Sequence, residues 1–114
     1  FFTETFGRML GISDDLAKRM ERTIERQFGI DWSHLRGTAL APQMNAPLLV
    51  IHDEDDADVP ARFGHDLADV WPDAVLMLTR NLGHRRILRD PTVIAAAIEF
   101  IDRQRPERIA ANRR

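Results

Sequence analysis

The sequence has 114 residues, of which 44% are hydrophobic and 30% charged, and its formal net charge is −2. These values fit one ordinary globular domain and exclude the strongly basic surface that favours nucleic-acid binding. No stretch approaches the roughly 18 apolar residues that span a bilayer, and no signal-peptide pattern is present, so we expect a cytoplasmic protein without membrane association. The absence of cysteine excludes disulfides, thiol catalysis and cysteine-ligated zinc.

The first 46 residues predict helices. Apolar residues at helical spacing predict a short amphipathic helix over residues 1–10, and the start at Phe1 without an initiator Met indicates that the chain is part of a longer product. Ser13 can cap a second helix that ends at Gly29. We expect one narrow seam of this helix to be buried, and it consists of Leu16, Met20, Ile24 and Phe28. Residues 30–46 read as irregular, with three expected anchors: Trp32, Leu35 and Leu40.

Residues 47–104 predict a βαβα unit. The apolar runs 48–51 and 74–78 are typical of strands buried inside a parallel sheet. Between them, Pro60 can occupy the first turn of a helix, and Asp90 and Pro91 form an N-cap and first helical position for the last helix. The expected buried faces of these two helices are Phe63, Leu67, Val70 and Trp71 in the first, and Ile94, Ala97, Ile98 and Ile101 in the second.

The predicted fold class is therefore α/β, with two parallel strands joined by a right-handed crossover and preceded by two or more helices. Two such strands do not form a stable sheet alone, because each leaves an unpaired edge. We expect the remaining strands to lie outside this chain or to come from another copy. Residues 105–114 predict a flexible basic tail, with an anion-binding patch as the alternative.

One candidate site is the acidic loop at residues 53–58, which holds five carboxylates in six positions. Clustered carboxylates need a cation, a positive partner or solvent. A calcium EF-hand loop does not fit, because its sixth position is Asp58 and its twelfth is Gly64. Asp53 and Asp55 match the acidic pair of a haloacid-dehalogenase-like phosphatase, but no lysine follows Lys18 to complete such a site. We therefore predict no metal and no cofactor, and a solvated acidic turn remains the plain alternative.

The second candidate is His84, which follows the second predicted strand. Parallel strands bring their carboxyl ends together, so the acidic loop and His84 should lie side by side. A carboxylate that holds one ring nitrogen of a histidine orients it as a general base. Arg85 and Arg86 could neutralise the acidic loop, which we favour, or bind an anionic substrate group. His52 is interpreted as a support for the turn, and His34 and His65 as surface residues.

Residues 47–101 resemble the C-terminal portion of an α/β-hydrolase. The family's turn His-Gly-x-x-Asp-x-x-Val-Pro is matched by residues 52–60, its Gly-His pair by residues 83–84, and the following Asp-Pro by residues 90–91. The resemblance implies that Asp56 is the acid and His84 the base of a catalytic triad. It further implies that residues 1–46 are the end of a cap region. By position in the turn, Asp56 should face His84, whereas the other four carboxylates should face solvent or arginines.

Two positions depart from the family pattern. Asp53 replaces the turn glycine, so its backbone must avoid a left-handed conformation or tolerate strain, and Asn81 stands where glycine is frequent. A nucleophile elbow of the type Gly-x-Ser-x-Gly is missing, since Ser13 and Ser33 are the only serines and neither has flanking glycines.

We therefore expect the complete protein to hydrolyse an ester-like or related small molecule, with Ser or Asp as nucleophile, and this chain alone to be inactive. The alternative is a non-catalytic fragment that associates through its sheet edge and apolar helix.

Overall fold

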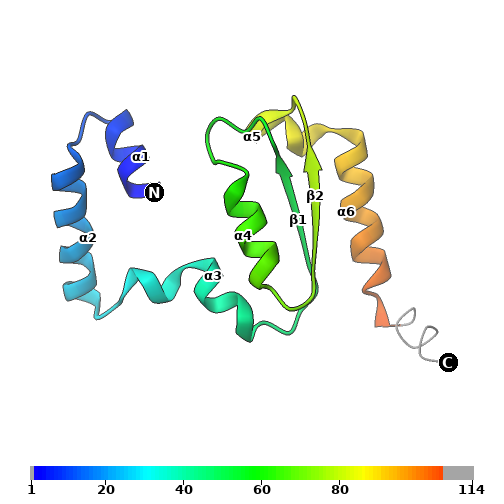
Figure 1. The fold of residues 1–114 in the computed structure, drawn as a ribbon, viewed down its shortest axis with the longest axis horizontal. Coiled ribbons are helices and arrows are strands. Elements are labelled where there is room, and N and C mark those ends of the chain that lie inside the picture. Colours follow the sequence, from blue (N-terminus) through cyan, green and yellow to red (C-terminus); the bar gives the residue numbers. More distant parts are fainter. Residues whose placement is uncertain (1, 107–114) are drawn as a thin grey trace. The chain divides into compact units, whose positions relative to one another are not determined.

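A computed structural model of the chain describes residues 2–106, and the chain forms two compact units that divide after Ala39. Figure 1 shows the first unit as helical and the second as a two-stranded sheet with helices. The expected α/β class is confirmed. The division falls earlier than the boundary expected at residue 46, because the η2 turn (Ala41–Gln43) contacts a helix of the second unit and Ala46 accepts a hydrogen bond from Trp71 there.

The first unit consists mainly of α1 (Phe2–Met9) and α2 (Asp14–Phe28), followed by the short turns η1 (Trp32–Leu35) and α3 (Gly37–Leu40), the last of which lies at the division. Ser13 caps α2 by accepting a hydrogen bond from the Leu16 N–H, and Gly29 ends the helix in a left-handed conformation, both as predicted. Arg8 binds the Asp14 carboxylate through two hydrogen bonds of 3.0 and 2.9 Å and so ties α1 to the start of α2.

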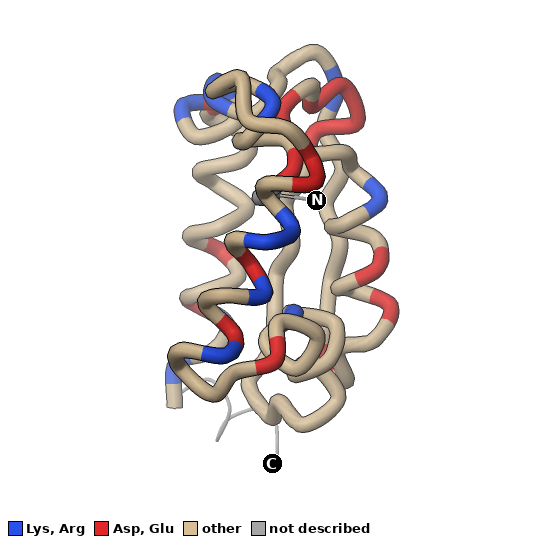
Figure 2. The backbone as a smooth tube through the Cα atoms, turned by 90° about the vertical axis from the view of Figure 1, so that its left-hand side faces the viewer, with Lys and Arg blue, Asp and Glu red and all other residues tan. Residues whose placement is uncertain are grey.

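The predicted buried seam of α2 is wrong. Only Ala17 is buried on this helix, and all four residues of the predicted seam are between 36% and 67% exposed. The eight-residue α1 is about half as long as α2 and leaves most of the seam uncovered, while Lys and Arg alternate with Asp and Glu on the remaining surface (Figure 2). The three expected anchors of residues 30–46 are exposed as well, although the Trp32 indole donates a hydrogen bond to the Glu21 carbonyl.

The second unit contains strands β1 (Leu48–Asp53) and β2 (Ala74–Thr79), which pair in parallel from Leu48 opposite Ala74 to Asp53 opposite Thr79. Its helices are α4 (Arg62–Val70), α5 (Gly83–Arg86) and α6 (Pro91–Arg103), with the η3 turn (Ile87–Arg89) before α6. The parallel βαβα order is confirmed. Asp90 caps α6 by accepting from the Val93 N–H, and Pro91 is its first residue, as predicted.

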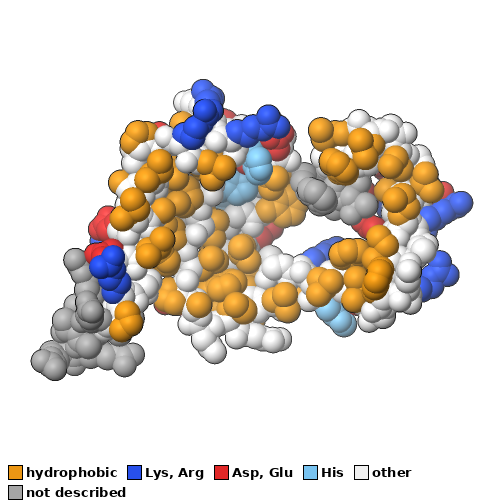
Figure 3. Space-filling view, turned by 180° about the vertical axis from the view of Figure 1, so that it is seen from behind, with side chains coloured by type: hydrophobic (Ala, Val, Ile, Leu, Met, Phe, Trp, Pro, Cys, Tyr) orange, Lys and Arg blue, Asp and Glu red, His pale blue; other side chains and the backbone are white. Residues whose placement is uncertain are grey.

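The expected buried faces of α4 and α6 are only partly correct. Helix α4 begins at Arg62, two residues after Pro60, and its buried residue is Gly64, whereas Phe63 and Val70 are 36% and 38% exposed. In α6 the buried residue is Val93, and Ile94, Ile98 and Ile101 are 44% to 66% exposed. Two strands offer too little surface to cover both helices, and Figure 3 shows hydrophobic side chains gathered on one face of this unit.

No helix within residues 2–106 is long and apolar enough to cross a bilayer. The basic tail predicted for residues 105–114 lies outside the described residues from position 107 onward.

These exposed faces lead to a prediction about association. Within residues 2–106 the sheet has two strands, so the outer edges of β1 and β2 are unpaired there, and Val75 and Leu78 of β2 remain 54% and 37% exposed. Unpaired edges and apolar faces favour pairing with other chains. We expect light scattering at micromolar concentration to show species larger than the 13.1 kDa monomer. A monodisperse monomer would contradict this expectation.

Candidate functional site

The acidic loop and the loop that carries His84 lie side by side because β1 and β2 run parallel. Asp53 ends β1 directly opposite Thr79, which ends β2, so both loops leave the sheet at the same end (Figure 1). The Glu54 N–H donates to the Thr79 carbonyl at 2.8 Å and continues the ladder into the loops. The topology therefore brings residues 53–59 next to residues 80–84.

Asp56 and His84 are joined by a hydrogen bond. His84 Nδ1 lies 2.8 Å from Asp56 Oδ2, and the Asp56 side chain is 5% exposed whereas that of His84 is 49% exposed. The other oxygen of Asp56 accepts the N–H groups of Asp58 and Val59 at 2.9 and 2.8 Å. Since the carboxylate accepts, Nδ1 carries a proton, and in the neutral ring Nε2 then keeps its lone pair. The predicted pairing of these two residues is therefore confirmed as geometry, while their catalytic role stays a prediction.

His52 approaches the same oxygen of the Asp56 carboxylate as His84 does. Its Nε2 donates to the Val59 carbonyl at 2.9 Å and lies 3.4 Å from Asp56 Oδ2, and its side chain is 13% exposed. A carbonyl oxygen can only accept, so Nε2 of His52 carries a proton. His52 thus fastens the far end of the acidic turn to β1, which agrees with its predicted supporting role.

Two further carboxylates of the loop bind the backbone of the neighbouring loop. Asp53 is fully buried and accepts from the Thr79 hydroxyl at 2.6 Å and the Leu82 N–H at 3.0 Å. Asp55 accepts the Asn81 N–H at 2.8 Å. The expectation that Asp53 would face solvent or arginines is wrong, because the backbone N–H groups after β2 point at the turn and need acceptors. Asp55 is exposed, as expected, although it also accepts the Asn81 N–H. Glu54 pairs with Arg80, and Asp58 is exposed, as expected.

The hydrogen bonds determine how the two acidic side chains titrate. Burial alone would raise the pKa of Asp53, but donors from Thr79, Gly83, Leu82 and Asp55 outweigh it and lower the pKa from 3.8 to about 2. For Asp56, burial again raises the pKa, and the Val59 N–H together with His84 and the Asp58 N–H lowers it below its usual value. Both groups are therefore ionised at neutral pH.

At the two positions that depart from the family pattern, Asp53 and Asn81, the backbone conformations match the expectations. Asn81 has a φ of 62° and Gly83 a φ of 70°, whereas Asp53 is not among the described residues with positive φ. Asp53 avoids strain because it belongs to the extended strand β1. Its side chain then supplies an acceptor that a glycine there would lack.

The favoured role of Arg85 and Arg86 is wrong for Arg86. Its guanidinium donates to the carbonyls of Leu82 and Asn81 at 3.0 and 2.7 Å, within its own loop. Arg80 carries out the neutralisation instead, through Glu54. Arg85 is exposed, and no described acidic group pairs with it.

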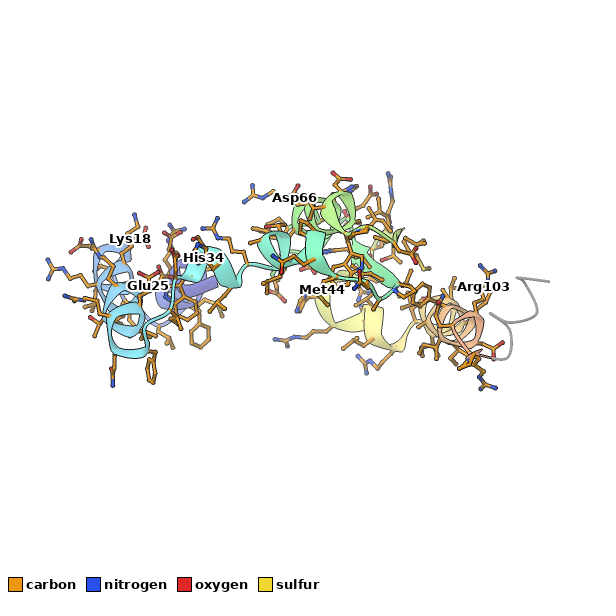
Figure 4. The ribbon with its side chains drawn as sticks, turned by 90° about the horizontal axis from the view of Figure 1, so that it is seen from below. Lys18, Glu25, His34, Met44, Asp66 and Arg103 are labelled. Atoms are coloured by element: carbon orange, nitrogen blue, oxygen red, sulfur yellow. The ribbon has the colours of Figure 1, made fainter. Side chains whose placement is uncertain are left out.

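The other histidines and serines do not join this site. His34 lies in η1 of the first unit with an 82% exposed side chain (Figure 4), and His65 is exposed on α4. Ser13 caps α2, and Ser33 hydrogen-bonds Asp31. Sequence reasoning missed Thr79 as the partner of Asp53; its only sequence signal is its position at the end of the second strand, which pairs with the end of the first.

A cavity of about 290 Å³ adjoins the pair. Its apolar walls come from Ile51, Val59, Ile87 and Leu88, and its polar lining from His52, Asp53, Asp56 and His84. A pocket that combines apolar walls with converging polar groups can hold a small organic ligand.

A cation would have to compete with the hydrogen bonds of the site. Asp56, Asp58 and His84 each offer one ligand atom, and these atoms lie within 4.8 Å of one another. Both oxygens of Asp56 already accept hydrogen bonds, however, and Nδ1 of His84 carries the proton of one of them. These donors satisfy the carboxylate without an ion.

Comparison of the chain with protein-family models, with curated proteins and with solved structures found no match. What remains as a guide to function is the geometry of the site and the motif that residues 52–60 and 83–91 carry.

Asp53 leads to a prediction about acid stability. Its pKa is about 2 in the folded chain, against 3.8 without the fold, so the unfolded state binds the proton first as the pH falls. The stability that ionised Asp53 contributes is complete above about pH 4 and is lost between about pH 4 and pH 2. Asp56, whose pKa is also lowered, adds a contribution of the same sign.

We expect the free energy of unfolding of the second unit, measured in urea, to fall over this interval, and to fall less steeply in Asp53→Asn. Equal slopes in the two proteins would contradict the role of Asp53.

Gly64 gives a second prediction. A Cβ at this position of α4 would lie 2.7 Å from His52 Nδ1, so Gly64→Ala must displace the ring that fastens the turn. Alanine favours helices by about 1 kcal/mol over glycine, but the overpacking costs about 1–3 kcal/mol. We expect net destabilisation of the second unit, seen as faster hydrogen exchange in β1 and β2.

Gly7→Ala is the matched control, because its Cβ would meet Ala17 at an ordinary 3.7 Å. The helix preference of alanine then acts without overpacking, and the backbone amides of α2 should exchange no faster than in the wild type. A stabilised Gly64→Ala would show that His52 is not held tightly.

Proposed function

We propose that residues 47–101 form the C-terminal part of an α/β-hydrolase whose triad acid is Asp56 and whose base is His84. The complete, cytoplasmic protein would hydrolyse an ester-like or related small molecule. The observation that carries this proposal is the 2.8 Å hydrogen bond between the buried Asp56 carboxylate and Nδ1 of the half-exposed His84.

The chemistry follows from the state of each nitrogen. Asp56 fixes the tautomer with the proton on Nδ1, which leaves the Nε2 lone pair free to accept a proton. As that proton arrives, the ring becomes a cation, and the ionised Asp56 stabilises it. His84 also lines the 290 Å³ cavity, whose apolar side chains suit the non-polar part of a substrate.

The nucleophile must come from elsewhere under this proposal. Ser13 and Ser33 are the only serines of the sequence, and both lie in the first unit. The acid and the histidine would therefore serve a Ser or Asp on a strand that pairs with the free edge of this sheet. The reaction type depends on that residue.

We predict that the 114-residue chain does not hydrolyse activated esters such as p-nitrophenyl acetate above the background rate, because the nucleophile and oxyanion donors supply most of the acceleration. In a longer chain that contains a strand and nucleophile elbow, His84→Ala should lower kcat by about 10⁴-fold or more. Exposed His65→Ala is the control and should keep full activity.

Two results would count against the proposal. Turnover by the short chain that His84→Ala abolishes would indicate a dyad that activates water. A longer chain whose activity survives both His84→Ala and Asp56→Asn would remove the triad assignment.

A non-catalytic role in association is the second candidate. Two observations favour it. The sheet has two open edges within the described residues, and α2 carries a row of exposed apolar residues, namely Leu16, Met20, Ile24 and Phe28. If association is the function, variants that make the α2 row polar abolish the larger species, and His84→Ala leaves them unchanged.

A further inference from the structure

We infer that Asp53 is a positioning residue for His84: its buried carboxylate holds the backbone that precedes the histidine, so that the imidazole meets Asp56. Its significance for catalysis rests on the proposed function, whereas the positioning itself is a property of the loops.

The Asp53 carboxylate links three segments. One oxygen accepts the Asp55 N–H at 3.0 Å, within the acidic turn. The other accepts the Thr79 hydroxyl at 2.6 Å, at the end of β2, and the Leu82 N–H at 3.0 Å, two residues before His84. The side chain is fully buried, so water does not compete for these oxygens.

The segment that Asp53 holds has an unusual backbone. Asn81 and Gly83 both have positive φ, and the Leu82 N–H that Asp53 binds lies between them. Asp55 binds the Asn81 N–H, and Arg86 binds the carbonyls of Asn81 and Leu82. A residue keeps a left-handed backbone conformation where contacts with the surrounding structure hold it there. The direction in which the His84 side chain leaves this segment therefore depends on these contacts. Among the three side chains that make them, only that of Asp53 is buried.

The chemistry of this position favours aspartate over its isostere. Thr79, Leu82 and Asp55 all donate, so the side chain must accept at both oxygens. An asparagine has one acceptor oxygen, and its NH₂ group would face a backbone N–H or the threonine hydroxyl. Asp53→Asn thus keeps the size of the side chain and removes one of its two acceptor oxygens.

The test reads His84 directly in the full 114-residue chain. Nitrogen NMR of protein labelled only at its four histidines reports whether His84 carries its proton on Nδ1, and hydrogen exchange of the Leu82 and Gly83 amides reports whether the loop is held. In Asp53→Asn we expect these amides to exchange about tenfold faster or more, and His84 to lose its single Nδ1–H tautomer. Glu54→Gln removes the same charge from the same turn, and Asp66→Asn removes one on the outer side of α4 (Figure 4); both should behave like the wild type.

A second variant decides the question if Asp53→Asn loses the sheet, as judged by exchange of the Val50 and Leu76 amides. Thr79→Val removes one donor to Asp53 and keeps its shape, so the Leu82 amide should exchange faster while β1 and β2 stay protected, and Thr79→Ser should restore the wild-type rate. The inference is overturned if His84 keeps its tautomer and Leu82 its protection in a folded Asp53→Asn, or, where that variant unfolds, in Thr79→Val. Because no activity is measured, failure of the hydrolase proposal leaves this result interpretable.

Discussion

The second unit depends on how the carboxylates after β1 are satisfied. Four successive acidic residues occupy positions 53–56, and ionised groups of one sign so close together repel each other unless donors or cations face them. The end of β2 and the loop after it supply a partner for each: Thr79 and Leu82 for Asp53, Arg80 for Glu54, the Asn81 N–H for Asp55, and His84 for Asp56. The parallel register makes this match possible, because Asp53 lies opposite Thr79 and the two loops leave the sheet together.

Much of this arrangement follows from the sequence. The caps at Ser13 and Asp90, the parallel order of the strands and the pairing of Asp56 with His84 all depend on short-range rules or on topology, which a single sequence carries. The expectation for Asp53 is wrong for a physical reason. A carboxylate is normally assigned to solvent, and its burial depends on backbone N–H groups whose direction follows from the positive φ of Asn81 and Gly83.

The expected buried faces failed for a different reason. A helical apolar stripe states which side of a helix prefers to be covered, but not whether a covering element exists. In α2 and α6 the stripes are present and stay exposed, since α1 is short and the sheet has two strands within the described residues. The pattern was thus correct as a preference and wrong as a description of this chain.

Asp56 contacts two histidines through different ring nitrogens, and the two histidines differ in their surroundings. His52 directs its protonated Nε2 to the Val59 carbonyl and the Asp56 carboxylate, with its ring against Gly64 of α4, so it has no room to turn. His84 presents Nδ1 instead, and its side chain lines the cavity. The exposure of the two side chains, 13% and 49%, follows the same division. A base must exchange protons with a ligand, and a support must not, so under the proposed function His84 would be the reactive histidine and His52 the group that keeps Asp56 in place.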